Sequence, residues 1–276
     1  MRAYVELVRA PAALTVLGDT VAGAAFGPGL GGRRLALPAA SVAFYWAGMA
    51  LNDWSDRTLD AVERPERPIP SGRVSPAAAL GVAVGLTATG LALAAAAGRL
   101  KAAVPLAAAV WAYDTVLKQT PAGPAAMAAC RGLDVLMGGG RAALPAALAL
   151  GGHTLGVTVL SKGEVHGGSS SVAKGVLAGT VASALAATAG RARSVRHRLL
   201  GAAGAAAYAG LVGRAQLAAA REPTAAAVRG ATKAGIHGMV PLQSALAARA
   251  GSVRSALLVA GALPLARRLS RKVGPT

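Results

Sequence analysis

The sequence has little of three kinds of side chain: cysteine, aromatic residues and charged residues. Its one cysteine, Cys130, excludes an intramolecular disulfide framework and a zinc site built on thiolates. Aromatic residues make up 3% of the chain, which leaves little material for stacking nucleic-acid bases. Charged residues make up 14%, against about 25% in a soluble globular domain. These shortages argue against a disulfide-rich, a base-stacking and a soluble globular protein.

Apolar residues fill the chain instead, at 54% of 276 residues and a mean hydropathy of +0.50. Because lipid forces backbone groups to pair within each segment, the long apolar runs predict transmembrane helices. We predict one all-α membrane domain over residues 1–276, a bundle of nine or ten helices, with glycines such as Gly81 and Gly85 at close helix contacts. The predicted segments are about residues 10–30, 35–53, 76–98, 101–118, 122–139, 142–162, 172–190, 197–218, 224–248 and 252–268.

The basic residues dominate the charge, giving a net charge of +18. They are scattered at the ends of the apolar runs, which disfavours nucleic acid as a partner and favours anionic lipid headgroups. With a cytoplasmic N-terminus, more of them fall on the cytoplasmic side, although the group at 191–198 opposes this orientation. We predict a multi-pass protein of the cell (inner) membrane with cytoplasmic active-site loops. Glu6 argues against a signal peptide, and residues 267–276 are expected to form a basic cytoplasmic cap.

Acidic residues are few, and their distribution is informative. Five of the 11 lie between positions 53 and 66, directly after an apolar run. On a helix, Asn52, Asp56 and Asp60 share one face at a spacing of four residues, where like charges repel. A divalent cation with oxygen ligands would compensate, and Mg²⁺ prefers one or two carboxylates plus phosphate oxygens. The alternative is a solvated loop in which the acids pair with Arg57, Arg64 and Arg67. The helical register at a membrane boundary favours the metal.

The string Asn52-Asp-Trp-Ser-Asp-Arg-Thr-Leu-Asp60, followed by Arg64-Pro-Glu-Arg-Pro-Ile-Pro-Ser-Gly72, resembles the NDxxDxxxD…RPxxSG signature of the UbiA prenyltransferase family. The resemblance implies a helical bundle around a central, lipid-accessible cavity. It also implies that a polyprenyl diphosphate, held by Mg²⁺, ionises and that a hydrophobic or aromatic acceptor attacks the carbocation. Metal ions and arginines suit the leaving diphosphate, and an apolar cavity shields the cation from water. We expect Asp53, Asp56 and Asp60 to be the catalytic residues.

Two further strings match the family less closely. Tyr113-Asp-Thr-Val-Leu-Lys118-Gln-Thr120 resembles its Tyr-x-x-x-Lys-Arg-x-Thr motif, and Lys118 could reach the diphosphate or simply snorkel at a helix end. Where the family has a second acidic motif, DxxxD, this chain has Leu160 and Glu164, with Lys162 and His166 nearby. A second metal would be held poorly there. These strings resemble the EboC-like branch, which is associated with secondary-metabolite gene clusters.

The predicted site therefore has two sets of ligands. The metal ligands are Asn52, Asp56, Asp60 and, for a partial second site, Glu164. The diphosphate ligands are Arg9, Arg64, Arg67, Tyr113, Lys118 and Lys162, although Arg9 could instead contact a lipid headgroup. The altered second motif also leaves open a non-catalytic relative that binds or carries an isoprenoid or lipid-like metabolite.

A few polar residues lie inside the predicted spans, where charges are costly and are usually paired or functional. For Arg131 and Asp134 we prefer an ion pair at a spacing of three residues over a catalytic role. His153 is expected to be a hydrogen-bonded interior histidine. Asp19 could line the cavity or bond to Thr20 or a neighbouring helix.

Overall fold

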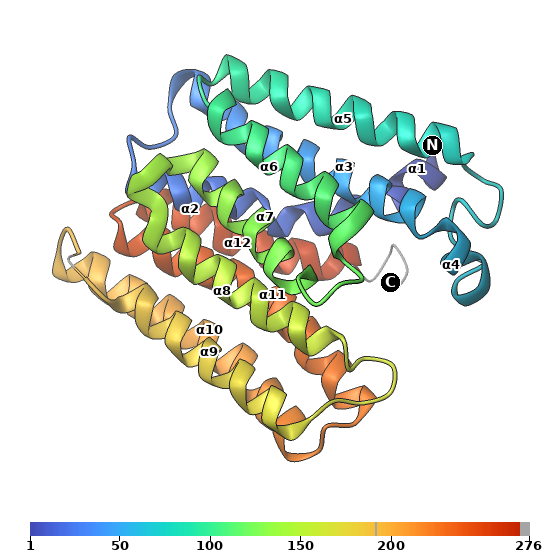
Figure 1. The fold of residues 1–276 in the computed structure, drawn as a ribbon. Helices are drawn as coiled ribbons and strands as arrows, with labels where there is room; N and C mark the ends of the chain where they lie inside the picture. Colours follow the sequence, from blue (N-terminus) through green and yellow to red (C-terminus); the bar gives the residue numbers. More distant parts are fainter. Residues whose placement is uncertain (191, 271–276) are drawn as a thin grey trace.

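The computed structural model describes residues 1–190 and 192–270, and every regular element within them is a helix (Figure 1). Twelve α-helices are interspersed with three 3₁₀ segments and one π-helical segment. The α-helices are α1 (Arg2–Leu7), α2 (Leu17–Phe26), α3 (Leu37–Ser55), α4 (Arg57–Glu63), α5 (Pro76–Ala96), α6 (Leu100–Ala112), α7 (Gly123–Gly139), α8 (Leu144–Ser161), α9 (Ser170–Thr188), α10 (Val195–Arg221), α11 (Ala225–Arg249) and α12 (Val253–Ser270). The other segments are η1 (Ala10–Thr15), η2 (Gly32–Ala36), η3 (Tyr113–Leu117, π-helical) and η4 (Gly140–Ala143).

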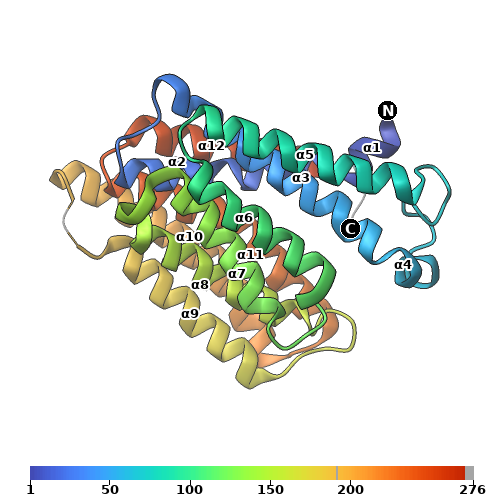
Figure 2. The ribbon, with the colours of Figure 1, turned by 45° about the horizontal axis from the view of Figure 1, so that its top comes forward.

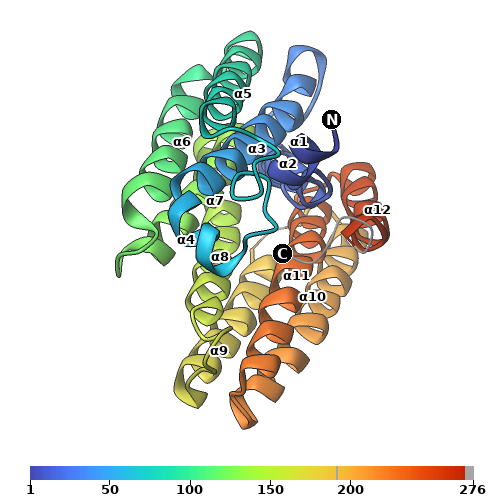
Figure 3. The ribbon, with the colours of Figure 1, turned by 90° about the vertical axis from the view of Figure 1, so that its right-hand side faces the viewer.

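The helices form two connected groups (Figures 1 and 2). One group joins α3, α5 and α6, and the other joins α8 to α11. The pair α2 and α7 connects the groups, because α2 packs on α7, α3 and α11 while α7 packs on α6 and α8. Viewed from the side, the two groups lie one above the other, with α5 and α6 toward the top and α9 at the bottom (Figure 3). The predicted all-helical bundle is confirmed, but the described residues form twelve α-helices instead of the nine or ten predicted.

Each of the ten predicted segments overlaps at least one helix, but the segments are not equally suited to crossing a membrane. By length and composition, five described stretches qualify: residues 32–55, 76–96, 100–117, 123–161 and 170–188. The fourth of these stretches, residues 123–161, contains both α7 and α8. The first predicted segment, residues 10–30, is wrong as one continuous span. It divides into η1 and α2, and the ten residues of α2 reach only about 15 Å at 1.5 Å per residue.

Local sequence signals explain where several helices begin. Ser75 and Thr224 precede α5 and α11, and each side-chain oxygen accepts a hydrogen bond from the backbone N–H three residues later, at 3.2 Å in both cases. Pro76 occupies the first position of α5, where the missing N–H has no intrahelical partner to lose. These caps satisfy backbone donors at the helix ends. The basic tail predicted at 267–276 lies mostly outside the described residues, which end at Ser270.

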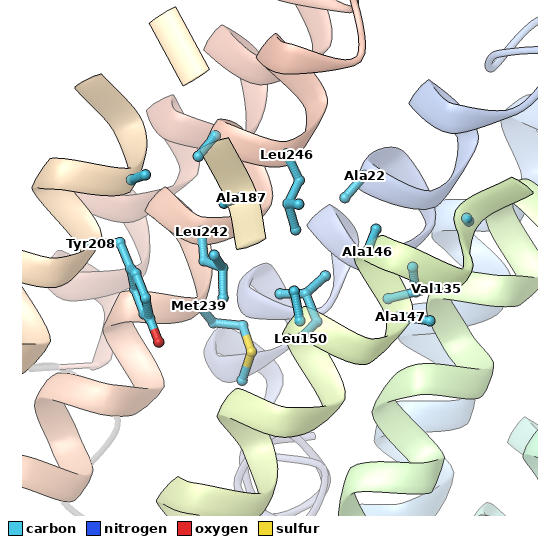
Figure 4. Close-up of a cluster of buried hydrophobic side chains, with 14 of the residues drawn as sticks. Ala22, Val135, Ala146, Ala147, Leu150, Ala187, Tyr208, Met239, Leu242 and Leu246 are labelled. Carbon is cyan, nitrogen blue, oxygen red and sulfur yellow. The ribbon is translucent and has the colours of Figure 1, made fainter. Parts of the chain in front are cut away.

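Small residues allow the closest helix contacts in the core. In Figure 4, Ala22 of α2 lies beside Val135 of α7 and Ala146 of α8 within one buried cluster. Along the same seam, a Cβ added at Gly23 or Gly138 would collide with the backbone of the facing helix. The predicted contact role of Gly81 and Gly85 is wrong, because a Cβ at either position would meet nothing within 4 Å. Composition predicts close packing, but only the fold shows which glycines make it.

Replacing Gly138 by valine should destabilise the bundle. The added Cβ would lie 2.8 Å from the Thr20 Cα, and backbone atoms cannot yield as a flexible side chain can. Overpacking of this kind costs about 1–3 kcal/mol. Thermal unfolding in detergent should show a lower midpoint for Gly138→Val than for the wild type. Gly81→Val is the matched control, and equal shifts for both variants would contradict a specific α2–α7 contact.

Candidate active site

The first acidic motif lies at the end of α3 and the start of α4. α3 ends at Ser55, but the backbone keeps its helical hydrogen bonds across the junction. The Asp56 N–H donates to the Asn52 carbonyl at 2.9 Å, and the Asp60 N–H donates to the Asp56 carbonyl at 2.8 Å. The predicted four-residue register of Asn52, Asp56 and Asp60 is therefore confirmed in the backbone.

Two arginines from outside the helix neutralise part of the motif. Arg67 forms an ion pair with Asp60 at 2.6 Å and a longer one with Asp53 at 3.4 Å. Arg9, which precedes η1, reaches Asp53 at 2.8 Å and also contacts the sulfur of Met49. Asp53 and Asp60 are both buried, at 3% exposure, so these pairs are screened from water. The solvated-loop alternative is wrong for Asp53 and Asp60, although it named one of their actual partners.

Lys118 pairs with the middle acid of the motif. Its Nζ lies 2.8 Å from Asp56 Oδ1, and its side chain is only 9% exposed. A lysine that snorkels at a helix end would place its ammonium in water. The buried pair is incompatible with that reading and brings Lys118 into the predicted site.

A π-helical turn explains how Lys118 reaches Asp56. The family motif has three residues between tyrosine and lysine, whereas four separate Tyr113 from Lys118. η3 absorbs the extra residue: the Lys118 N–H donates to the Tyr113 carbonyl at 2.9 Å, a bond spanning five residues. Such single turns accommodate an insertion within a helix and are frequent at functional sites. Tyr113 is half-buried on the same turn.

The backbone at Arg9 is strained. Its φ of 46° and ψ of 49° place it in the left-handed region, and it is the one non-glycine residue with positive φ in the described chain. Such conformations cost about 1–3 kcal/mol and persist where surrounding contacts enforce them. In this conformation the Arg9 side chain contacts Asp53 and Met49. The geometry favours a site role for Arg9 over a lipid headgroup contact.

The N-terminal helix is tied to the loop after the motif. Arg73 forms an ion pair with Glu6 and donates to the Glu66 carbonyl at 2.6 Å. The hydrogen bond from Arg73 lowers the pKa of Glu6, and charge attraction to Arg73 and Arg2 adds to it. Arg64, a predicted diphosphate ligand, is exposed on this loop. The structure leaves Arg64 apart from the carboxylates, so its role stays a prediction.

Oxygen donors at the motif suit magnesium. Asn52 and Asp56 offer amide and carboxylate oxygens, and only one Asp56 oxygen is engaged by Lys118. Within the described residues, no group of three or more His, Cys, Asp and Glu side chains is close enough to bind a metal by itself. Mg²⁺ needs only one or two carboxylates when phosphate oxygens complete its shell, so the donor set fits a metal that arrives with a diphosphate.

The region of the second motif lies at the end of α8 and in the loop after it. Leu160 is buried at the end of α8, and Lys162 and His166 are exposed on the loop that follows. The Glu164 carbonyl accepts a hydrogen bond from Arg229 of α11 at 2.7 Å. The structure thus ties this loop to α11. The roles of Lys162 as a diphosphate ligand and Glu164 as a metal ligand stay predictions.

The charged residues inside the bundle pair differently from expectation. Arg131 forms its ion pair with Asp19 of α2, while Asp134 accepts a hydrogen bond from Ser41 of α3. The predicted Arg131–Asp134 pair is therefore wrong as the main contact. Asp19 also accepts from Gln243 of α11 at 2.7 Å, which confirms that it bonds to neighbouring helices. Arg131 and Asp134 are three residues apart on α7, which would allow an ion pair within the helix. Arg131 pairs instead with Asp19 of another helix.

His153 is a hydrogen-bonded interior residue, as predicted. Its Nε2 lies 2.9 Å from the Gly235 carbonyl and its Nδ1 lies 2.7 Å from the Tyr208 hydroxyl. The carbonyl can only accept, so Nε2 donates and Nδ1 accepts from the tyrosine. A hollow of about 560 Å³ lies nearby on α10 and α11, lined by Leu211, Arg214 and small residues. This hollow lies on α10 and α11, whereas the first acidic motif lies on α3 and α4. The predicted central cavity therefore stays a prediction.

Asp114 is the site residue that the sequence analysis did not assign. It is 3% exposed, and its Oδ1 accepts a hydrogen bond from Asn52 Nδ2 at 3.2 Å. Its backbone carbonyl accepts from the Ser55 hydroxyl at 2.7 Å. The available signal was a carboxylate between Tyr113 and Lys118 in an otherwise apolar span, where charge is costly.

Residues 13–220 match the UbiA prenyltransferase family. A digeranylgeranylglyceryl phosphate synthase from Methanopyrus kandleri is 41% identical over 128 residues, which cover 44% of this chain and 46% of that protein. The chain thus spans about half the length of such curated relatives. These relatives are named as digeranylgeranylglyceryl phosphate synthases, so the predicted resemblance to the EboC-like branch is not supported.

Solved structures agree on the fold. One, of a digeranylgeranylglyceryl phosphate synthase, has a TM-score of 0.65 at 18% identity and covers 91% of this chain and 98% of its own. Another, of a UbiA homolog from Archaeoglobus fulgidus bound to GPP and Mg²⁺, has a TM-score of 0.61 at 12% identity and covers 88% and 99%. At these identities the likeness establishes the shared helical architecture.

Proposed function

Because the chain belongs to the UbiA prenyltransferase family, a family of alkyl-group transferases, we propose that it transfers a prenyl group from a prenyl diphosphate to an acceptor within the membrane. One observation supports this most directly. Asp53, Asp56 and Asp60 each pair with a basic side chain, and those bases converge from three separate parts of the chain. A site with several cations and several carboxylates can hold a diphosphate together with its metal.

Oxygen-bearing and basic side chains have different roles in the proposed site. Asn52 and Asp56 would hold Mg²⁺, which when bound supplies positive charge for the leaving diphosphate. Lys118, Arg9 and Arg67 bind the diphosphate oxygens, and the planar guanidinium groups can do so with two parallel hydrogen bonds. Asp53 and Asp60 orient the two arginines.

The reaction needs no nucleophilic side chain. The bond between the allylic carbon and the diphosphate oxygen breaks, and the diphosphate leaves with the electron pair. The acceptor donates an electron pair to that carbon and releases a proton. Positive charge at Lys118 and the arginines stabilises the leaving group, and exclusion of water protects the cation until the acceptor attacks.

For the acceptor we favour a glyceryl phosphate lipid over an aromatic compound. The support is the similarity to digeranylgeranylglyceryl phosphate synthases over 44% of the chain. A phosphate on the acceptor also suits a chain with 29 basic residues and only 11 acidic ones. A hydroxyl of such a lipid would form an ether with the transferred prenyl group.

The acceptor is tested with purified protein in lipid, supplied with Mg²⁺ and geranylgeranyl diphosphate. Diphosphate release and lipid products are measured with geranylgeranylglyceryl phosphate or with 4-hydroxybenzoate as acceptor. We expect an ether product and release at least tenfold faster with the glyceryl phosphate. Faster diphosphate release with 4-hydroxybenzoate would show that a glyceryl phosphate lipid is the wrong acceptor. It would not contradict the proposed prenyl transfer.

A carrier of isoprenoid or lipid-like molecules is the second candidate. The observation that favours it is the second motif, where buried Leu160 replaces one carboxylate and the Glu164 loop is bound to Arg229. A carrier would bind prenyl diphosphate in a manner dependent on the first motif but would release no diphosphate. The same assay, with binding measured in parallel, separates the two functions.

A further inference from the structure

Asp114 contacts the first motif from a different helix. α6 continues into the π-helical η3, and the turn brings Asp114 against the end of α3. Two hydrogen bonds join them: Asn52 Nδ2 to Asp114 Oδ1 at 3.2 Å, and Ser55 Oγ to the Asp114 carbonyl at 2.7 Å. The second bond fixes the backbone of Asp114, so the carboxylate has little freedom to move away from Asn52.

The direction of the bond determines which way the Asn52 amide faces. An ionised carboxylate only accepts hydrogen bonds, so the Asp114 carboxylate selects the NH₂ group of Asn52. The amide oxygen must then face away from Asp114. Among the described residues, it accepts no hydrogen bond from another side chain or backbone group, which leaves it available to a ligand.

We infer that Asp114 is a positioning residue, which turns the amide oxygen of Asn52 toward the metal and diphosphate. This inference rests on the proposed function. Mg²⁺ takes oxygen ligands, and an NH₂ group in the same place would present hydrogen atoms to a cation. Asp114 touches neither substrate nor metal in this arrangement; it acts through Asn52.

The packing around Asp114 is consistent with a fixed geometry. Gly48 lies one turn before Asn52 on α3, and a Cβ there would be 3.2 Å from Val110 Cγ1 and 3.6 Å from Asp114 Oδ2. The absence of a side chain at Gly48 therefore leaves room for α6 and its carboxylate to approach α3. The alternative is a tie, in which the hydrogen bond only holds α3 and η3 together. A tie would also need the hydrogen bond, but it would not depend on which side chain donates.

The variant that separates positioning from a tie is Asp114→Asn, which can still hydrogen-bond to Asn52 but no longer fixes which side chain donates. Asp114→Leu removes the acceptor. The double variant Asn52→Asp with Asp114→Asn restores the bond with its direction reversed, and it still presents an oxygen to the metal. Mn²⁺, which takes the same oxygen ligands as Mg²⁺, is titrated in the presence of inorganic diphosphate and followed by electron paramagnetic resonance. Thermal unfolding of each variant is measured in the same lipid.

We expect Asp114→Leu to raise the Mn²⁺ concentration at half-saturation about tenfold, the usual size for loss of a metal's outer partner. We expect Asp114→Asn to weaken metal binding as Asp114→Leu does, and metal binding equal to that of the wild type would overturn the inference in favour of a tie. The double variant should recover to within about threefold of the wild type. An unchanged half-saturation in Asp114→Leu, or no recovery in a folded double variant, would overturn the inference. A wild type that binds no Mn²⁺ with diphosphate would overturn the proposed function and this inference together.

Discussion

Replacing Asp56 by alanine is expected to lower Mg²⁺-dependent diphosphate release by about 10²–10³-fold, the usual effect of removing one group that stabilises transition-state charge. Asp56 is the one motif acid paired with Lys118, at 2.8 Å. The substitution removes a metal ligand and also leaves a buried ammonium without its counter-charge. Release is measured with purified protein in lipid, with geranylgeranyl diphosphate as donor.

Glu63→Ala is the matched control for Asp56→Ala. Glu63 belongs to the same acidic segment but is exposed at the end of α4. Its removal should change the rate by less than about twofold, because exposed acids contribute little. Full activity in Asp56→Ala would contradict the assignment of the site. Absence of release in the wild type, with prenyl diphosphate still bound in an Asp56-dependent way, would favour the carrier.

Sequence patterns predicted the elements that depend on local chemistry. Long apolar runs gave the helices, and the four-residue spacing of Asn52, Asp56 and Asp60 survived in the backbone because consecutive helical hydrogen bonds cross the α3–α4 junction. Arg67 was also recognisable, since it lies only seven residues from Asp60. These features need only the chain's own periodicity and nearby charges.

Contacts between distant segments could not be read from the sequence. Arg131 has Asp134 three residues away, yet it pairs with Asp19, which is 112 residues distant. The choice depends on how α2 packs against α7, and that packing is set by glycines whose neighbours the sequence does not reveal. The π-helical turn between Tyr113 and Lys118 was likewise not predicted from the sequence pattern.

Replacing Lys118 by methionine is expected to change two affinities in opposite directions. The Lys118 ammonium lies 2.8 Å from one Asp56 oxygen, and its positive charge opposes the binding of a cation at the other oxygen. Without the ammonium, Mn²⁺ alone should bind Asp56 more tightly, because competing positive charge is gone. Binding of prenyl diphosphate should weaken roughly 10- to 100-fold, since hydrogen bonds to charged groups contribute about 1.5–3 kcal/mol.

Opposite changes in the two affinities would show that Lys118 exchanges its ion-pair partner during binding. A lysine that only supports the structure of the site would not produce them. Exchange means that Lys118 leaves Asp56 for the diphosphate when substrate binds, which removes its positive charge from beside the metal ligand Asp56. Lys101→Met is the control, because Lys101 is an exposed lysine in α6. Mn²⁺ binding without diphosphate and prenyl diphosphate binding without metal are measured separately for both variants. If both affinities fall in Lys118→Met, the ammonium supports the geometry of Asp56 rather than competing with the metal, and the exchange is wrong.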